Sequence, residues 1–309
     1  MGSRLLVTVS VPTTSAEPSD TVGAPHTRAA SGAAMAITAI VFVQLSVAAS
    51  TSLFDQLGSL GTAWLRLAWA GPVLFLLVRP RWSRFTREAR LTCVALGVAT
   101  VAVTMLFLAS VTRLPLGTAS ALEFLGPLGV AVLHRKGARK RWPALAAVGV
   151  VLLTDPWQSG VDPVGVALAL AAAAGWGGYI LLTQRAGDQV AGLEGLAISL
   201  PVAAVVATVV AGPSTFDQLT WPTVFVGLGL ALLGPVIPFS LEFLALRRLT
   251  TAAFGTLMSL EPAVASIIGL LALHQVPALA PMIGIGLVVA AGIGAERSGA
   301  RPLSEPLPS

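Results

Sequence analysis

Long apolar stretches separated by short polar connectors run through most of the chain. A helix of about 20 residues, rising about 1.5 Å per residue, crosses a hydrocarbon core about 30 Å thick. The pattern predicts ten such helices, at residues 33–50, 60–78, 91–109, 117–133, 142–155, 164–183, 196–211, 223–243, 251–273 and 278–295. The chain is therefore expected to be an all-α integral membrane protein.

One apolar run carries polar chemistry at its centre. Residues 252–274 contain Glu261 and Pro262 near the middle. Proline has no N–H to donate, so the carbonyl of Met258, four residues back, loses its helical partner where water is scarce. A charged side chain at that depth costs about 2.5 to 3.5 kcal/mol on insertion scales and usually faces a cavity or a partner. An acid beside an open carbonyl predicts a polar site inside a helical bundle.

The same combination occurs earlier in the chain. Glu123 stands four residues before Pro127, so here the freed carbonyl is that of Glu123 itself. A shift of 135 residues superposes Pro127 on Pro262 and Arg113 on Arg248. Such matches at one fixed offset indicate an internal repeat.

The repeat divides the predicted helices into two sets of five. Because five is odd, the second set enters the membrane from the opposite side, and inverted repeats of this kind are typical of secondary transporters with a midplane site. The expected organisation is a disordered cytoplasmic tail at 1–31, a first repeat at 32–156, a second repeat at 163–295 and a cytoplasmic tail at 296–309.

The composition agrees with a membrane protein. Of the 309 residues, 55% are hydrophobic and only 11% are charged, a mixture that water-soluble domains do not use. The net charge of +5 suggests nucleic acid at first sight. The basic residues lie between the apolar runs, however, where they set topology, so no nucleic-acid partner is expected. The single cysteine, Cys93, excludes an internal disulfide.

The distribution of basic residues predicts that both termini are cytoplasmic. Basic residues concentrate in cytoplasmic connectors of membrane proteins. With ten spans and a cytoplasmic N-terminus, Arg113 falls outside and Arg66 lies within a helix. The other 17 of the 19 basic residues fall in cytoplasmic segments: Arg4, Arg28, Arg79, Arg81, Arg84, Arg87, Arg90, Arg135, Lys136, Arg139, Lys140, Arg141, Arg185, Arg247, Arg248, Arg297 and Arg301.

Glu261 is the strongest candidate for function. Intramembrane acids usually line pathways, so Glu261 is interpreted as a protonatable or cation-binding group. The alternative is an acid that bonds to a neighbouring helix and only fixes packing. Pro127 and Pro262 are candidates for conformational gating, although proline kinks often serve packing alone.

Arg66 and Glu123 lie at comparable depth in their predicted helices. A guanidinium suits a carboxylate, and a carboxylate suits an ammonium, so the pair is suited to hold both ends of a zwitterionic amino acid. The equally acceptable alternative is a structural ion pair between the two side chains.

Three further residues are predicted to line a cavity. Gln44 corresponds to Tyr179 under the same shift, and Trp176 lies about one helical turn from Tyr179. Their helices are therefore expected to offer hydrogen-bonding and aromatic groups to a substrate. Simple packing of buried aromatic rings is the alternative.

Glu242 receives a different interpretation. It stands at the inner end of its predicted helix, close to Arg247 and Arg248. An interfacial ion pair is expected there.

The chain carries none of four common sequence signatures of catalysis. There is no HExxH, no GxSxG, no phosphate-binding Walker loop and no metal-ligand cluster in the sequence. No enzymatic activity and no cofactor are expected, and any transport must use gradients or a separate partner.

Three segments resemble a known family. They are ALEFLGPL at 121–128, FGTLMSLEPAVAS at 254–266 and LRLAWAGPVLFLLVRPR at 65–81. They are similar to the threonine/homoserine exporter (RhtA-type) branch of the EamA, or drug/metabolite transporter, superfamily. The resemblance covers about residues 33 to 295. It implies an inner-membrane carrier with two inverted EamA repeats that exports small amino acids or related metabolites, coupled to proton entry. The chain departs from the superfamily at His274 and Gln275, where a Leu-Gly-Glu ending is common.

The resulting hypothesis is an exporter that works by alternating access. Glu123 and Glu261 serve as protonation or cation sites, Arg66 pairs with the substrate carboxylate, and Pro127 and Pro262 let their helices flex. The expected partners are a small-molecule substrate, protons and membrane lipid, with a homo-oligomer left open. An exporter of drugs or other metabolites is the alternative within transport. A membrane enzyme or a non-transporting membrane scaffold is the alternative of another class.

Overall fold

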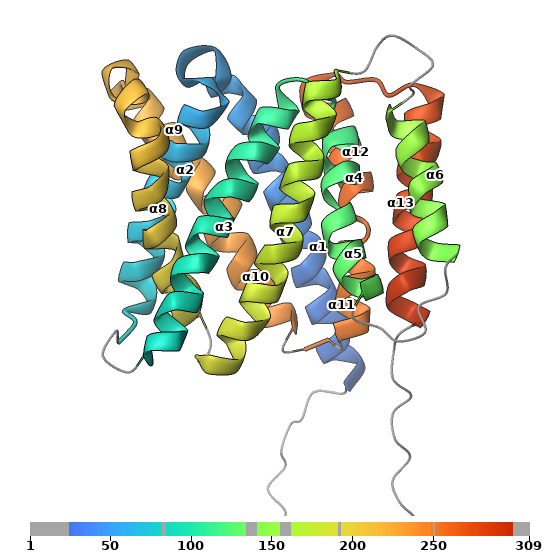
Figure 1. The fold of residues 1–309 in the computed structure, drawn as a ribbon, viewed down its shortest axis with the longest axis horizontal. Coiled ribbons are helices and arrows are strands. Elements are labelled where there is room, and N and C mark those ends of the chain that lie inside the picture. Colours follow the sequence, from blue (N-terminus) through green and yellow to red (C-terminus); the bar gives the residue numbers. More distant parts are fainter. Residues whose placement is uncertain are drawn as a thin grey trace, which may run out of the picture.

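The structure is a computed structural model that describes residues 25–81, 85–133, 141–154, 162–190, 193–246, 248–249 and 251–298. Within these residues the regular elements are all helices, and most of them run between the same two ends of the molecule (Figure 1). Helix α1 begins and α13 ends at the same end of the bundle (Figure 1). The all-α architecture predicted from the sequence is confirmed at this level.

The helices follow one another through short connections. The first part of the described chain contains α1 (Pro25–Ser50), the 3-10 turn η1 (Thr51–Leu53), α2 (Phe54–Val78), α3 (Arg87–Val111), α4 (Leu116–Glu123), α5 (Leu125–Leu133) and α6 (Arg141–Thr154). The second part contains α7 (Pro163–Gln189), α8 (Glu194–Thr215), the 3-10 turn η3 (Phe216–Gln218), α9 (Trp221–Ala231), the π-helical turn η4 (Leu232–Val236), α10 (Ile237–Leu246), α11 (Thr251–Met258), α12 (Glu261–Leu273) and α13 (Leu279–Ser298).

Local sequence signals explain several of these helix starts. The Thr86 hydroxyl accepts the backbone N–H of Ala89 and caps α3. Asp162 caps α7 and is followed by Pro163 at the first helical position, where the missing N–H of proline has no consequence. Thr220 and Thr223 cap α9 reciprocally. Side chains that accept the first free N–H groups thus determine where these helices begin.

The first helix is longer than the sequence predicted. Helix α1 begins at Pro25 rather than near residue 33, so the last part of the segment predicted as a tail, 1–31, belongs to a helix. Alanines such as Ala29 and Ala30, strong helix formers, extend the helix beyond the apolar run. The remainder of that predicted tail lies outside the described residues.

The apolar helices have the dimensions of membrane spans. Among the described residues, six helical stretches are long and apolar enough to cross a bilayer. The first of them, Ala29–Val78, is 50 residues long and contains α1 from Ala29 onward and all of α2. Large apolar side chains on the outside of the bundle remain exposed: Leu77 is 70% exposed, Val209 74% and Leu271 71%. An apolar surface of this extent is suited to lipid.

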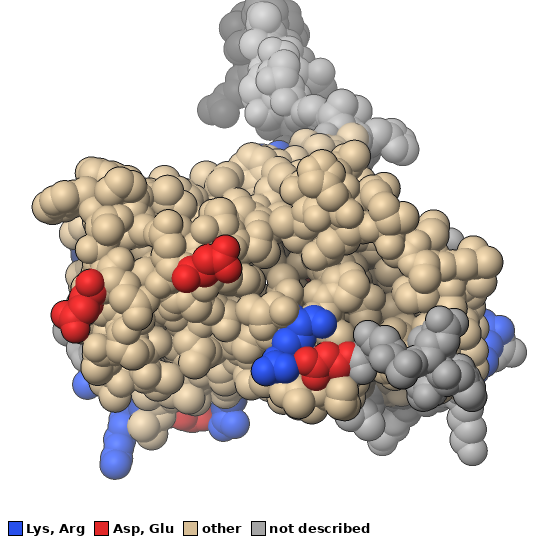
Figure 2. Space-filling view, turned by 90° about the horizontal axis from the view of Figure 1, so that it is seen from above, with Lys and Arg blue, Asp and Glu red and all other residues tan. Residues whose placement is uncertain are grey.

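The end of the bundle at which α4 and α7 begin carries few charged side chains among the described residues (Figure 2). One exposed ion pair lies there, with 2.6 Å between Arg113 Nη1 and Asp162 Oδ2. The hydrogen bond from Arg113 holds the pKa of the Asp162 carboxyl below its usual value. Described basic residues at the opposite end, such as Arg79, Arg87 and Arg185, lie at the ends of α2 and α3 and near the end of α7.

Helices α6 and α13 pack against each other through facing glycines at one edge of the bundle (Figure 1). A Cβ atom added to Gly149 would lie 2.9 Å from the carbonyl oxygen of Gly284, and one added to Gly284 would lie 2.7 Å from the carbonyl oxygen of Gly149. Both distances are shorter than van der Waals contact, so the two backbones approach as closely as they do only because both residues lack a side chain.

We expect Gly284→Ala to destabilise the protein, because its methyl group would overlap the Gly149 backbone. Overpacking of this kind typically costs about 1 to 3 kcal/mol. The control is Gly286→Ala in the same helix, where an added Cβ meets nothing within 4 Å. Both substitutions raise helix propensity equally, so the difference between their melting temperatures in detergent isolates the packing effect. Equal melting temperatures would contradict the packing described here.

Candidate functional site

Two helices are interrupted in the middle of the bundle, each beside an acid. Glu123 is the last residue of α4, and α5 starts after Phe124. Glu261 is the first residue of α12, which follows α11 after a tight turn at Ser259 and Leu260. Proline lies just inside each new helix, at Pro127 and Pro262. The interruptions predicted from the two prolines are therefore present, and both place a carboxylate at a helix end.

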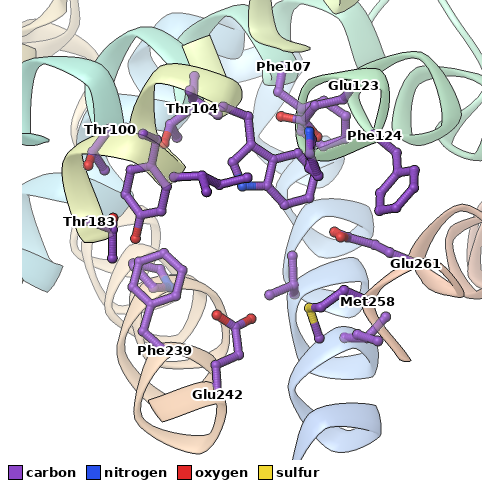
Figure 3. A pocket seen from close by; sticks show the side chains of 18 of the residues that line it. Thr100, Thr104, Phe107, Glu123, Phe124, Thr183, Phe239, Glu242, Met258 and Glu261 are labelled. Atoms are coloured by element: carbon purple, nitrogen blue, oxygen red, sulfur yellow. The ribbon is translucent and has the colours of Figure 1, made fainter. Parts of the chain in front are cut away.

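A cavity of about 620 Å³ lies between the interrupted helices and their neighbours. The predicted residues that line it are Arg66, Glu123, Pro127, Trp176, Tyr179 and Glu261. Figure 3 shows the carboxylates of Glu123, Glu242 and Glu261 directed toward one open space. Much of the remaining wall is aromatic or aliphatic, including Phe107, Phe239 and Met258. The fold thus brings most of the predicted residues together, although they come from different helices.

Glu261 is held by Gln44. The Gln44 side-chain amide donates a hydrogen bond of 3.0 Å from Nε2 to Glu261 Oε1. Gln44 is 1% exposed and Glu261 is 7% exposed. Gln44 Oε1 is buried and has no hydrogen-bond partner among the described residues. Gln44 therefore supports the acid from behind and does not line the cavity itself, which differs from the prediction.

The helix that follows Glu261 also favours its negative charge. Glu261 and Pro262 occupy the first turn of α12, where the unpaired N–H groups give the helix dipole its positive end. Pro262 is buried and does not line the cavity. Pro262 lies at the break between α11 and α12. Pro127 lies in the corresponding first turn of α5 and does line the cavity.

Arg66 is a buried cation without a carboxylate partner among the described residues. Its side chain is 5% exposed. Nη1 donates a hydrogen bond of 3.3 Å to Ser50 Oγ, whereas Nε has no hydrogen-bond partner in the part of the chain that the structure describes. No ion pair joins Arg66 to Glu123 in the described part of the chain, so the alternative of a structural ion pair between them does not hold in this conformation. The guanidinium retains capacity to bind an anion.

Aromatic rings form a wall beside these charges. Trp176 and Phe124 meet edge to face, with ring centroids 6.5 Å apart. Tyr179 and Phe239 are 6.3 Å apart by the same measure. Trp176 and Tyr179 both lie on α7 and both line the cavity. They therefore also pack against other rings, which was the alternative interpretation.

The cavity extends toward one end of the bundle. Gln184 and Leu196, near the end of α7 and the start of α8, line it together with Phe254 in the first turn of α11. The opposite end is tied together, because Gln275 Oε1 accepts a hydrogen bond of 2.8 Å from the backbone N–H of Leu116, the first residue of α4. The chain leaves α12 through His274, whose φ of 54° is left-handed.

Two features of the site were missed by the sequence prediction. The interfacial ion pair expected of Glu242 is wrong with respect to Arg248, which donates to Ser31 Oγ at 3.0 Å, while Glu242 lines the cavity. Arg247 lies outside the described residues. Glu242 is nevertheless an acid within an apolar run, and this is the same sequence signal that made Glu261 a candidate for function.

The second missed feature is the π-helical turn η4, Leu232–Val236. Turns of this kind are frequent at functional sites. A Cβ atom added to Gly234 in this turn would lie 2.5 Å from Arg66 Nη2 and 2.9 Å from Ser46 Oγ. The turn therefore leaves room for the guanidinium, and the adjacent Gly234 and Pro235 are the sequence signal that marks it. No group of three or more potential metal ligands occurs within the described ranges.

A bundle of apolar helices around a polar cavity is typical of a membrane transporter. Comparison with known proteins gives the family. The EamA-like transporter family matches residues 163–294. The threonine/homoserine exporter RhtA of Escherichia coli strain K12 is 37% identical over 262 residues, which cover 84% of this chain and 88% of the exporter. The chain belongs to the EamA-like transporter family and is a multi-pass protein of the inner membrane.

Further relatives agree with this assignment. The threonine/homoserine exporter RhtA of Salmonella typhimurium strain LT2 is 36% identical over 262 residues, again 84% of this chain and 88% of the exporter. One crystal structure superposes with a TM-score of 0.59 at 20% identity, covering 87% of this chain and 98% of the other. At this identity the superposition shows the fold alone. The named relatives are exporters and not enzymes.

The contact between Gln44 and Glu261 predicts a coupled pair. We expect Gln44→Leu to destabilise the protein by about 1 to 3 kcal/mol, because it leaves a buried carboxyl group without its partner. Adding Glu261→Leu is expected to recover part of that loss, since the acid that needed the amide is then absent. The measurement is a double-mutant cycle of thermal unfolding in detergent. Additive effects of the two substitutions would rule out the coupling.

Proposed function

We propose that this transporter exports small amino acids of the threonine and homoserine type by proton antiport with alternating access. The observation that carries the proposal is Arg66, a buried guanidinium with an unpartnered Nε, in the same cavity as Glu123 and Glu261. Among the described residues that line the cavity, a guanidinium without a carboxylate partner and nearby carboxylates form the complement of a zwitterion. The named relatives, which are threonine/homoserine exporters, support the same substrate class.

In this proposal Arg66 binds the substrate carboxylate. A guanidinium offers parallel N–H donors that match a carboxylate. Glu123 and Glu261 receive the substrate ammonium. The rings of Trp176 and Tyr179 enclose the side chain and exclude water.

We further propose that the helices form ten membrane spans, in which α4–α5, α9–η4–α10 and α11–α12 each count as one span. These spans form two inverted repeats of five, at 32–156 and 163–295. The mutual contact of Gly149 and Gly284 supports this arrangement, because the two residues are 135 positions apart. A residue that touches its own counterpart lies on a twofold axis relating the two halves.

A second pair of contacts supports the same symmetry. A Cβ atom on Gly32 would lie 2.9 Å from both Arg248 Cβ and Leu249 Cγ. A Cβ atom on Gly165 would lie 2.9 Å from both Arg113 Cβ and Leu114 Cγ. In this arrangement the first helix of each proposed repeat packs against a connector of the other, through two glycines that are 133 residues apart. The two connectors are again 135 residues apart.

The proposed orientation places both ends of the chain, including the segments 1–31 and 296–309 that the sequence predicted as tails, on the cytoplasmic side. It rests on the concentration of basic residues in the connectors at that end. The cavity then extends toward the cytoplasm, and the bond between Gln275 and Leu116 closes the outer end. This arrangement is the inward-facing state of an alternating-access cycle.

Proton entry is coupled to amino-acid export because the proton and the substrate ammonium compete for the same acid. A deprotonated Glu261, held by Gln44, attracts the substrate ammonium while the cavity faces the cytoplasm. After the helices around Pro127 and Pro262 rearrange, a proton from outside binds a Glu261 carboxylate oxygen, removes the attraction and releases the amino acid. The proton leaves to the cytoplasm when the cavity returns. One proton enters for each amino acid that leaves through this acid.

The size and walls of the cavity favour a second candidate. A volume of about 620 Å³ with many aromatic residues is in the range of pockets that hold drug-sized ligands. The alternative function is therefore export of drugs or other metabolites. It predicts broad competition among unrelated compounds and little dependence on Arg66.

We expect Glu261→Gln to abolish export driven by a pH gradient in proteoliposomes while the protein still inserts. The substituted amide cannot take up or release a proton. The matched control is Glu88→Gln, because Glu88 is an exposed acid that pairs with Arg185 and does not line the cavity. Gradient-driven export that persists in Glu261→Gln at the wild-type rate would remove Glu261 from the coupling mechanism.

We expect Arg66→Ala to weaken the binding of threonine more than that of threoninamide, which lacks the carboxylate. The expected difference is at least about tenfold, or about 1.4 kcal/mol. Binding is measured with the purified protein in detergent by titration calorimetry. Equal losses for both ligands would show that Arg66 acts only through the structure of the bundle.

A further inference from the structure

Glu242 is the acid in the cavity to which the proposed function gives no role. It lies on α10 and lines the cavity together with Tyr179 and Phe239. Figure 3 shows its carboxylate directed into the open space, on the side opposite Glu123. In the proposed function, Arg66, Glu123 and Glu261 would bind the α-carboxylate and α-amino groups of a small amino acid, which leaves Glu242 available for a further contact.

No side chain in the described part of the structure neutralises Glu242. It makes no ion pair there and no hydrogen bond. Arg66 donates to Ser50, and Arg248, the described basic residue that follows Glu242 in the chain, donates to Ser31. A carboxylate removed from water without a counter-charge is costly, so an arriving cation gains an interaction that none of the described residues supplies.

The surroundings of Glu242 suit an alkylammonium group. The rings of Tyr179 and Phe239 lie beside one another at 6.3 Å, and the electron-rich face of an aromatic ring attracts a cation. Met258 and Phe254 also line the cavity and offer apolar contact for a methylene chain. An acid, two rings and an apolar wall form a complete environment for an ammonium on an aliphatic stem.

The charges of the whole cavity lead to the same conclusion. Three carboxylates and a single guanidinium line it among the described residues. A neutral amino acid brings one ammonium and one carboxylate and leaves the excess of acids unchanged. An amino acid with a second ammonium at the end of its side chain compensates one more acid. The volume of about 620 Å³ also exceeds what a small amino acid needs.

We propose that the transporter also carries α,ω-diamino acids of the lysine and ornithine class, with Glu242 as the partner of the side-chain ammonium. This inference rests on the proposed function, because Arg66, Glu123 and Glu261 would hold the α-carboxylate and α-ammonium groups in the same way. Glu242 thereby acts as a specificity-determining residue at the far end of the cavity.

The test is counterflow in proteoliposomes with labelled lysine and norleucine. Norleucine has the same number of side-chain carbons and lacks the terminal ammonium. The wild-type protein is expected to carry lysine faster than norleucine. In Glu242→Gln the ratio of the lysine rate to the norleucine rate is expected to fall at least about tenfold, as for loss of one partner of a buried charge pair. Glu242→Asp, which keeps the charge, is expected to retain the preference for lysine.

Two results would overturn the inference. One is a wild-type protein that exchanges threonine but not lysine, and the other is a ratio that stays the same in Glu242→Gln. If Glu242→Gln does not fold, the wild-type rates and the Glu242→Asp ratio still decide the question. Absence of threonine counterflow in the wild-type protein would instead contradict the proposed function, so the two failures are distinguishable.

Discussion

The hydrocarbon core supplies no water to free backbone groups, so a broken helix is tolerated there only where it is buried in protein or lines a water-filled cavity. Two helices of this bundle are broken by proline, and each break is next to an acid, Glu123 or Glu261. Residues at both breaks line one cavity, which gives their acids a common polar surrounding. The remaining features of the site follow from this constraint. Arg66 and Glu242 enter the same space from other helices, and Gln44 supports Glu261 from behind.

Much of the fold was accessible from the sequence because lipid imposes simple rules. Apolar length predicted where helices lie, and Pro127 and Pro262 predicted where they break. The prediction failed at the beginning of α1, where alanines extend the helix beyond the apolar run to Pro25. Helix ends depend on caps and propensity, which are weaker signals than a membrane-spanning apolar segment.

The site was predicted less completely, because sequence does not say which faces of the helices meet. Depth in the membrane suggested that Arg66 and Glu123 belong together, and it could not decide between a shared substrate and an ion pair. In the structure Arg66 donates to Ser50, and Arg66 and Glu123 line the same cavity without forming an ion pair with each other. Glu242 was assigned to the nearest arginines along the chain, whereas the turn of α10 directs it into the cavity. Gln44 was placed in the cavity wall, and the structure places it behind Glu261.

The central claim is that this cavity is exposed in turn to the two sides of the membrane. Val43 on α1 lines the cavity, and the chain has a single native cysteine, Cys93, which is buried. The direct measurement is labelling of Val43→Cys, in a Cys93→Ser background, by a membrane-impermeant thiol reagent added to either side of oriented vesicles. Alternating access predicts that the reagent labels Val43→Cys from both sides, and that threonine slows the labelling in each case. Reaction from one side only, whatever substrate or pH gradient is applied, would contradict it.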